Sequence, residues 1–131
     1  MPASDHLFKL REDGRKLTEE LADAFHHMVY ELLFAANRAR HDIQAAVSLL
    51  TTQVKAPDED DWGKLVRVLK YINGTGYMKL ILSADEMNFT VQWYVDGLHQ
   101  IHEDCRGQIE CLMTMGKGAA ISLSNIMKCN S

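Results

Sequence analysis

Proline and cysteine are both scarce in this 131-residue chain, which contains two prolines and three cysteines. An odd number of cysteines without a C-x-x-C pair does not build a disulfide framework, so reduced thiols are the simpler interpretation. The chain has no run of about eighteen apolar residues, so no transmembrane helix is expected. Its first residues also lack the basic and apolar segments of a signal peptide. We therefore expect an intracellular protein, cytoplasmic or nuclear, with no membrane partner.

An excess of positive charge is also missing, because the formal net charge is -4. A protein that binds nucleic acid by itself through one basic surface is usually positive, so tight autonomous binding is not expected. The hydrophobic share of 47% and the charged share of 24% are typical of a globular chain. At this length a single hydrophobic core can form without disulfides.

Most familiar catalytic motifs are absent from the sequence. There is no G-x-S-x-G elbow, no glycine-rich phosphate loop and no dinucleotide fingerprint. A zinc site made by His99, His102, Cys105 and Cys111 is the alternative to free thiols. Their spacing, H-x2-H-x2-C-x5-C, does not form the two close pairs of a zinc finger, so we favour free thiols.

The first half of the sequence has helical periodicity. We predict a long helix over 18–38, with Thr18 as its N-cap and an apolar stripe that includes Leu21 and Phe25. One member of the adjacent pair His26-His27 is expected to lean toward that stripe and pack there. A second helix is predicted from Asp42, as a capping residue, to about Lys55.

The third helix has the clearest start, because Pro57 and four acidic residues, Asp58 to Asp61, occupy its N-terminus. We interpret the acids as a structural cluster that suits the helix dipole, and expect Gly74 to end the helix in the left-handed conformation. Lys64, Arg67 and Lys70 lie on its polar side. A basic side of this kind is usually solvated; contact with a nucleic-acid backbone, together with Lys117, is the alternative.

From about residue 77 the apolar period changes to two, which indicates strands. Gly116-Lys117-Gly118 predicts a tight hairpin between the last two strands. The sequence therefore predicts an α+β fold, with three helices in 1–76 followed by a small, mainly antiparallel sheet in 77–131. The predicted strands are 77–82, 89–96, 108–115 and 119–124.

Asp96 is the one carboxylate placed at the end of an apolar strand. A carboxylate there can coordinate a metal ion, and nucleotidyl chemistry needs several carboxylates around two cations. The simpler interpretation, which we favour from the residues alone, is a strand-end side chain that faces water.

Several short motifs follow one another along nearly the whole chain: Phe25-His26-His27, Arg38-Ala39-Arg40, residues 54–65, Trp93-Tyr94-Val95-Asp96, His102 to Gly107, and Met115 to Ala119. In their order and spacing these motifs resemble the polyprotein of copia-type retrotransposons. The resemblance implies that 1–76 corresponds to the thumb and connecting helices that follow the reverse-transcriptase palm. It implies that 77–131 corresponds to the first three strands of a ribonuclease H domain, an incomplete ribonuclease H-like fold.

The same resemblance matches Asp96 to the first metal-binding carboxylate of the ribonuclease H site. In the parent family that site uses Mg²⁺ and acts on an RNA–DNA hybrid. This chain departs from the family at three places: Val95-Asp96-Gly97-Leu98 where the family has Val-Asp-Ala-Ser, Arg40-His41-Asp42 where it often has Arg-Pro-Asp, and Ile109-Glu110-Cys111.

In the family, the palm with its paired aspartates precedes this region, and a helix with the next catalytic Glu follows it. We therefore expect a fragment or degenerate remnant that is catalytically inactive alone and needs no cofactor. Two alternatives remain open. One is an interaction module that recruits a partner or a second copy through an unpaired sheet edge. The other is a weak nucleic-acid binder.

Overall fold

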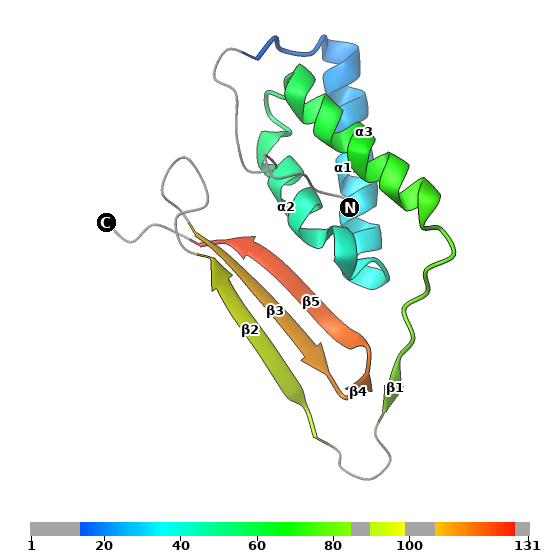
Figure 1. Ribbon diagram of the computed structural model, residues 1–131. Helices are drawn as coiled ribbons and strands as arrows, with labels where there is room; N and C mark the ends of the chain where they lie inside the picture. Colours follow the sequence, from blue (N-terminus) through cyan, green and yellow to red (C-terminus); the bar gives the residue numbers. More distant parts are fainter. Residues whose placement is uncertain (1–13, 85–89, 99–106, 128–131) are drawn as a thin grey trace. The chain divides into compact units, whose positions relative to one another are not determined.

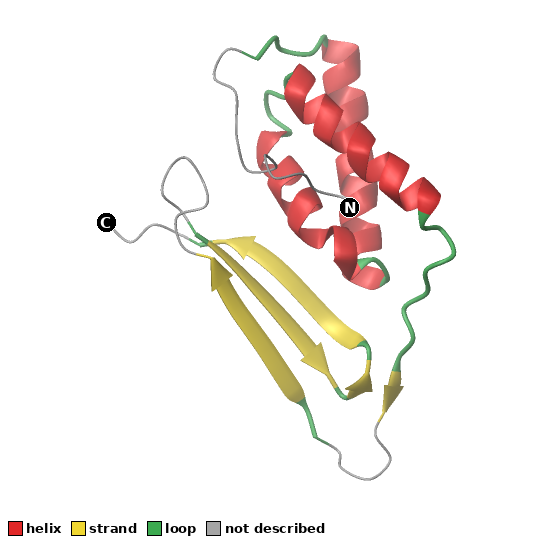
Figure 2. Ribbon diagram, viewed as in Figure 1, coloured by secondary structure: helices red, strands yellow, loops and turns green. Residues whose placement is uncertain are grey.

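A computed structural model of the protein describes residues 14–84, 90–98 and 107–127 (Figure 1). The chain divides into two compact units, Met1–Met78 and Lys79–Ser131. The first unit is helical and the second is a small sheet, as the secondary-structure colours of Figure 2 make clear. The prediction of an α+β fold, with three helices followed by a mainly antiparallel sheet, is confirmed.

The helical unit packs its helices around one apolar core. Apolar side chains recur on each helix at helical spacing, so each helix buries one stripe. The helices are α1 (Glu19–Arg38), the short 3-10 turn η1 (His41–Ile43), α2 (Gln44–Gln53) and α3 (Glu59–Gly74). The core consists of Phe25, Val29, Leu32, Ala36, Ile43, Ala46, Val47, Leu49, Leu50, Leu65 and Val68.

The buried stripe of α1 is narrower than the sequence suggested. It is centred on Phe25, Val29, Leu32 and Ala36, whereas Leu21 is 42% exposed. The prediction that His26 or His27 leans into this stripe is wrong, because both are exposed. Since Phe25 and Val29 define the inner face, residues one and two positions beyond Phe25 are rotated toward solvent.

α3 begins with reciprocal hydrogen bonds at its first turn. A carboxylate oxygen of Asp58 accepts from the backbone N–H groups of Asp60 and Asp61, each at 2.9 Å. In return, the Asp61 carboxylate accepts from the Asp58 backbone N–H at 3.2 Å. This capping box satisfies donors that the helix cannot satisfy itself. The interpretation of the acidic run as a structural cluster fits this geometry.

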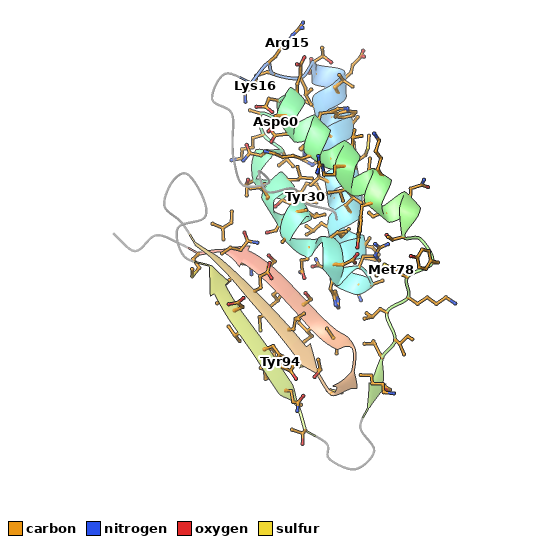
Figure 3. The ribbon with its side chains drawn as sticks, in the orientation of Figure 1. Arg15, Lys16, Tyr30, Asp60, Met78 and Tyr94 are labelled. Carbon is orange, nitrogen blue, oxygen red and sulfur yellow. The ribbon has the colours of Figure 1, made fainter. Side chains whose placement is uncertain are left out.

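The segment before α1 is attached to this same helix start. The backbone N–H of Glu59 donates to the Arg15 carbonyl at 3.0 Å, and the Lys16 ammonium donates to the Ala56 carbonyl at 2.7 Å. Figure 3 labels Arg15, Lys16 and Asp60 at this end of the helical unit. A Cβ added at Gly14 would collide with the Asp58 carboxylate, so glycine lets the segment approach closely.

Replacing Asp58 by alanine is expected to lower the free energy of unfolding by about 1–2 kcal/mol, because the cap and its box are lost together. Asp58→Asn is the matched control, since asparagine keeps an acceptor oxygen and is as good an N-cap. Urea unfolding followed by circular dichroism measures both. Equal losses in the two variants would contradict a capping role.

The end of α3 is predicted correctly in position but not in conformation. Gly74 is the last residue of the helix, as expected, but among the described glycines only Gly116 and Gly118 have positive φ, so the expected left-handed glycine cap is wrong. Thr75 is the C-cap, and its hydroxyl donates to the Tyr71 carbonyl at 2.7 Å. This bond satisfies one of the carbonyls left free at a helix C-terminus.

Asp42 does not cap the second helix, which corrects the prediction. Its carboxylate is held by Arg40 through two bonds, Nε–Oδ1 at 2.9 Å and Nη2–Oδ2 at 2.8 Å. α2 begins only at Gln44, after η1, and its N-cap makes no side-chain bond. A bidentate, charge-assisted ion pair is stronger than a hydrogen bond between neutral groups. The Asp42 carboxylate therefore pairs with Arg40 and does not cap α2.

The second unit is an antiparallel meander. Its strands are β1 (Ser83–Ala84), β2 (Gln92–Leu98), β3 (Gln108–Thr114), β4 (Gly116–Lys117) and β5 (Ala119–Ile126). The three longer strands form one sheet in the order β2-β3-β5, and β1 pairs with β4. The predicted glycine hairpin is confirmed between β3 and β5, where Gly118 has φ +79°. A Cβ there would collide with the Ile81 carbonyl.

The predicted strand over 77–82 is wrong, because only Ser83–Ala84 forms a strand there. Tyr77 is 78% exposed and Ile81 is 71% exposed. The alternation of Met78, Leu80 and Leu82 fits the period of a strand, but a strand also needs a partner for its backbone groups. β4, which pairs with β1, is only two residues long.

Candidate functional site

Asp96 lies in the second half of β2 and starts a polar row that crosses all three strands. In the antiparallel register Asp96 is opposite Glu110 on β3, and Glu110 is opposite Ser124 on β5. Directly paired residues point to the same face of a sheet, so the two carboxylates share one face. Gln108 lies on the same face, in the neighbouring row. We call Asp96, Glu110, Ser124 and Gln108 together the carboxylate row.

The carboxylate row is exposed at Asp96 and buried at its other end. The exposed Asp96 carboxylate accepts from the backbone N–H of Gly97 at 2.9 Å. Ser124 is 8% exposed and its hydroxyl donates to Glu110 at 3.4 Å; Gln108 is 1% exposed and its amide donates to Ser124 at 2.5 Å. These bonds orient Glu110 from the buried side.

The two facing carboxylates repel one another across the strands. Like charges directly opposite in a sheet are destabilising, and in most cross-strand pairs the effect is below about 1 kcal/mol. Among the described residues no cation is paired with either side chain. The pair therefore places two carboxylates side by side on the exposed part of the face, each with a hydrogen-bond donor but without a cationic partner among the described residues.

Proteins usually bind Mg²⁺ through the oxygen atoms of carboxylate side chains. Two facing carboxylates nevertheless supply too few ligands for two cations in catalytic geometry. Within the described residues no cluster of three or more metal-binding side chains exists. The two carboxylates have the chemistry of cation ligands but are too few to form a two-metal catalytic centre.

Glu110 is the residue that sequence reasoning missed. The sequence drew attention to it only within Ile109-Glu110-Cys111, a segment that departs from the pattern of the resembled family. Its position opposite Asp96 follows from the pairing of residues 92–98 with 108–114. The available signal was the tight Gly116-Lys117-Gly118 turn, which fixes β3 against β5, whereas the sequence between β2 and β3, residues 99–107, contains no such short glycine motif.

The four predicted basic residues do not form one solvated surface. Lys64 is largely covered: its side chain is 11% exposed, and its ammonium lies 2.9 Å from Asp60 and 3.8 Å from Asp61. The expectation of a solvated basic side is thus wrong for Lys64. Its i,i+4 spacing from Asp60 explains the pairing.

The remaining basic residues are exposed but divided between the units. Arg67 and Lys70 lie exposed on α3, whereas Lys117 lies exposed on β4 of the second unit. Of the alternative zinc ligands, His99, His102 and Cys105 lie outside the described residues. Cys111 is on β3, half-buried and not in a disulfide.

None of the helices in the described part of the chain is long and apolar enough to span a membrane. No family model matches the chain. Searches of curated proteins and of solved structures likewise find nothing that matches it.

Proposed function

We propose that the chain is part of a copia-type retrotransposon polyprotein and carries no catalytic activity of its own. In this proposal the helical unit corresponds to the thumb and connection of a reverse transcriptase. The sheet unit corresponds to the first strands of its ribonuclease H domain, in an intracellular setting.

One observation supports this proposal most strongly. The first long strand of a three-stranded antiparallel meander carries Asp96, the residue that matches the family's first metal-binding carboxylate. The helices-then-sheet order of the elements is also the order that the resemblance implies. The element order and the strand pairing come from the structure, whereas the match of Asp96 to that carboxylate rests on the motif resemblance.

Catalytic silence follows from the chemistry of the carboxylate row. Asp96 and Glu110 face one another, but a two-metal mechanism needs further carboxylates to hold both cations about 4 Å apart. Neighbouring Ser124 and Gln108 are neutral, and both are buried. Among the residues that the structure describes, the row therefore resembles one side of a cation site without the ligands that would complete it.

The test is cleavage of an RNA–DNA hybrid by the purified 131-residue chain with Mg²⁺ or Mn²⁺. We expect no cleavage above the buffer control, and no difference between the chain and its Asp96→Asn variant. Cleavage that disappears in Asp96→Asn, while Glu59→Gln on α3 retains it, would contradict the proposal. Circular dichroism verifies that both variants are folded.

Weak nucleic-acid binding is the less favoured alternative. Lys64 is already engaged by Asp60 and Asp61, which leaves Arg67 and Lys70 as exposed cations on α3. Two phosphate contacts give only a shallow dependence of binding on salt concentration. An interaction role is the other alternative. Its candidates are the free edges of β5, which ends just after Ser124, and of β2, since each of these strands pairs only with β3 among the described strands.

A further inference from the structure

The sheet has a second face that is entirely uncharged. Side chains alternate along each strand, so residues next to the carboxylate row point the opposite way. The register groups them into three rows: Trp93–Met113–Ile121, Val95–Cys111–Leu123 and Gly97–Ile109–Asn125. We call this the apolar sheet face.

This face is open to solvent. The exposed fractions of its apolar side chains are 64% for Val95, 55% for Trp93 and 47% for Leu123. They are 41% for Ile121 and 39% for Ile109. In the described part of the second unit no apolar side chain is buried. An exposed apolar patch of several hundred Å² on a protein marks an interaction site.

We propose that the apolar sheet face binds the same face of a second copy of this chain, forming a two-fold symmetric β-sandwich. A two-fold contact brings each surface against itself, so a face can pair with itself only if its charges do not clash. The apolar sheet face carries no charge at all. The opposite face would bring Asp96 and Glu110 against their own copies.

The size of the face also fits a pair of copies. Two packed sheets lie about 10 Å apart with their inner side chains interdigitated. By typical side-chain areas, two copies would together cover roughly 1,000 Å², near the lower limit for a specific interface. We therefore expect a reversible dimer rather than an obligate one.

The arrangement makes a geometric prediction about Cys111. This residue lies at the middle of β3, the central strand, and in the middle row of the face. A two-fold axis through the centre of the face brings the two Cys111 side chains toward each other across the sandwich. Association through the β2 edges would instead keep the two β3 strands about three strand spacings, roughly 14 Å, apart.

The first experiment is sedimentation equilibrium of the full chain. We expect a monomer–dimer equilibrium that Val95→Lys weakens at least about tenfold, because a buried ammonium would have no partner. Tyr94→Lys is the matched control: Tyr94, labelled in Figure 3, is the preceding residue, is 57% exposed and, by the alternation of side chains along β2, lies on the other face. It should leave the equilibrium unchanged.

The second experiment uses a bismaleimide of about 8 Å span, near the separation of packed sheets, on a Cys105→Ser/Cys129→Ser background. We expect a covalent dimer through Cys111, which Val95→Lys or Leu123→Lys suppresses and Cys111→Ser abolishes. A chain that stays monomeric at millimolar concentration overturns the proposal. So does a dimer that is insensitive to Val95→Lys, or one that does not cross-link, as expected for β2 edge pairing or for another occupant of the face.

Discussion

Replacing Phe25 by alanine is expected to lower the free energy of unfolding of the helical unit by about 4 kcal/mol. Phe25 is fully buried in α1 and belongs to the core that α1 forms with α2 and α3. Truncation removes the transfer energy of the ring and leaves a cavity that the close-packed helices fill only in part. This is the largest single-residue effect that we expect in the chain.

Phe34 provides a matched control on the same helix. Its ring is 66% exposed and contacts only the Arg38 guanidinium, 5.5 Å from the ring centroid, among the described aromatic interactions. Phe34→Ala should cost less than about 1 kcal/mol, the usual size of an exposed cation–π contact. Urea unfolding followed at the helical circular dichroism band measures both variants. Comparable losses would mean that α1 presents a different face to the core.

The second large effect is expected at Arg40, where alanine should lower the free energy of unfolding by about 3 kcal/mol. Its side chain is only 12% exposed. Besides Asp42, it donates to the Thr75 hydroxyl at 2.7 Å and to the Thr75 carbonyl at 3.3 Å. Its guanidinium also lies over the Tyr71 ring, 5.6 Å from the centroid. Arg40 thus joins the α1–η1 connection to the end of α3.

Removing Arg40 should also alter the dependence of stability on pH. Hydrogen bonding to Arg40 holds the pKa of the Asp42 carboxyl below its ordinary value of 3.8. A carboxyl whose pKa is lowered by folding stabilises the protein above its unfolded-state pKa. That stability is lost as the pH falls through the lowered folded-state pKa. The contribution should therefore disappear in strong acid in the parent chain and be much smaller in Arg40→Ala, where only the hydrogen bonds with Tyr71 and with the backbone still lower the pKa of Asp42.

Arg67→Ala is the control for this experiment, because Arg67 is exposed on α3. We expect it to change the free energy of unfolding by less than about 0.5 kcal/mol. Arg40→Lys separates charge from geometry, since lysine keeps the charge but not the planar fork. Denaturant midpoints measured from pH 2 to 7 give the comparison. A full rescue by lysine would contradict the bidentate arrangement.

Asp61 titrates in the opposite sense within the same unit. Burial chiefly raises the pKa of its carboxyl above 3.8. A raised carboxyl pKa lowers stability as the pH rises from the unfolded-state value to the folded-state value. The pH effect of Arg40 is therefore read from the difference between variant and parent, in which the Asp61 contribution cancels.

Local patterns in the sequence predict much of the helical unit. Periodicity locates α1 and α3 to within a residue or two, and the acidic run identifies the start of α3. The role of Asp42 could not be predicted in this way. The choice between capping α2 and pairing with Arg40 is biased by Thr75 and Tyr71, about thirty residues away in the sequence.

The sheet unit is less predictable because pairing decides it. Aromatic and β-branched residues identified β2, and the glycine hairpin identified β3 and β5. The alternation over 77–82 produced no strand, since none of the described strands pairs with it. The position of Glu110 opposite Asp96 depends on a register for which the sequence between the two strands, residues 99–107, contains no short turn motif. Register describes which residues of two strands lie opposite one another, so it cannot be predicted from the sequence of one strand alone.

The proposed origin of the chain in a retrotransposon polyprotein is tested most directly by sequencing the DNA on both sides of its reading frame. We expect upstream sequence that encodes a polymerase palm with paired aspartates, and downstream sequence that encodes a helix with a further catalytic glutamate. Flanking DNA that encodes neither element, on either side of the reading frame, would contradict the proposal.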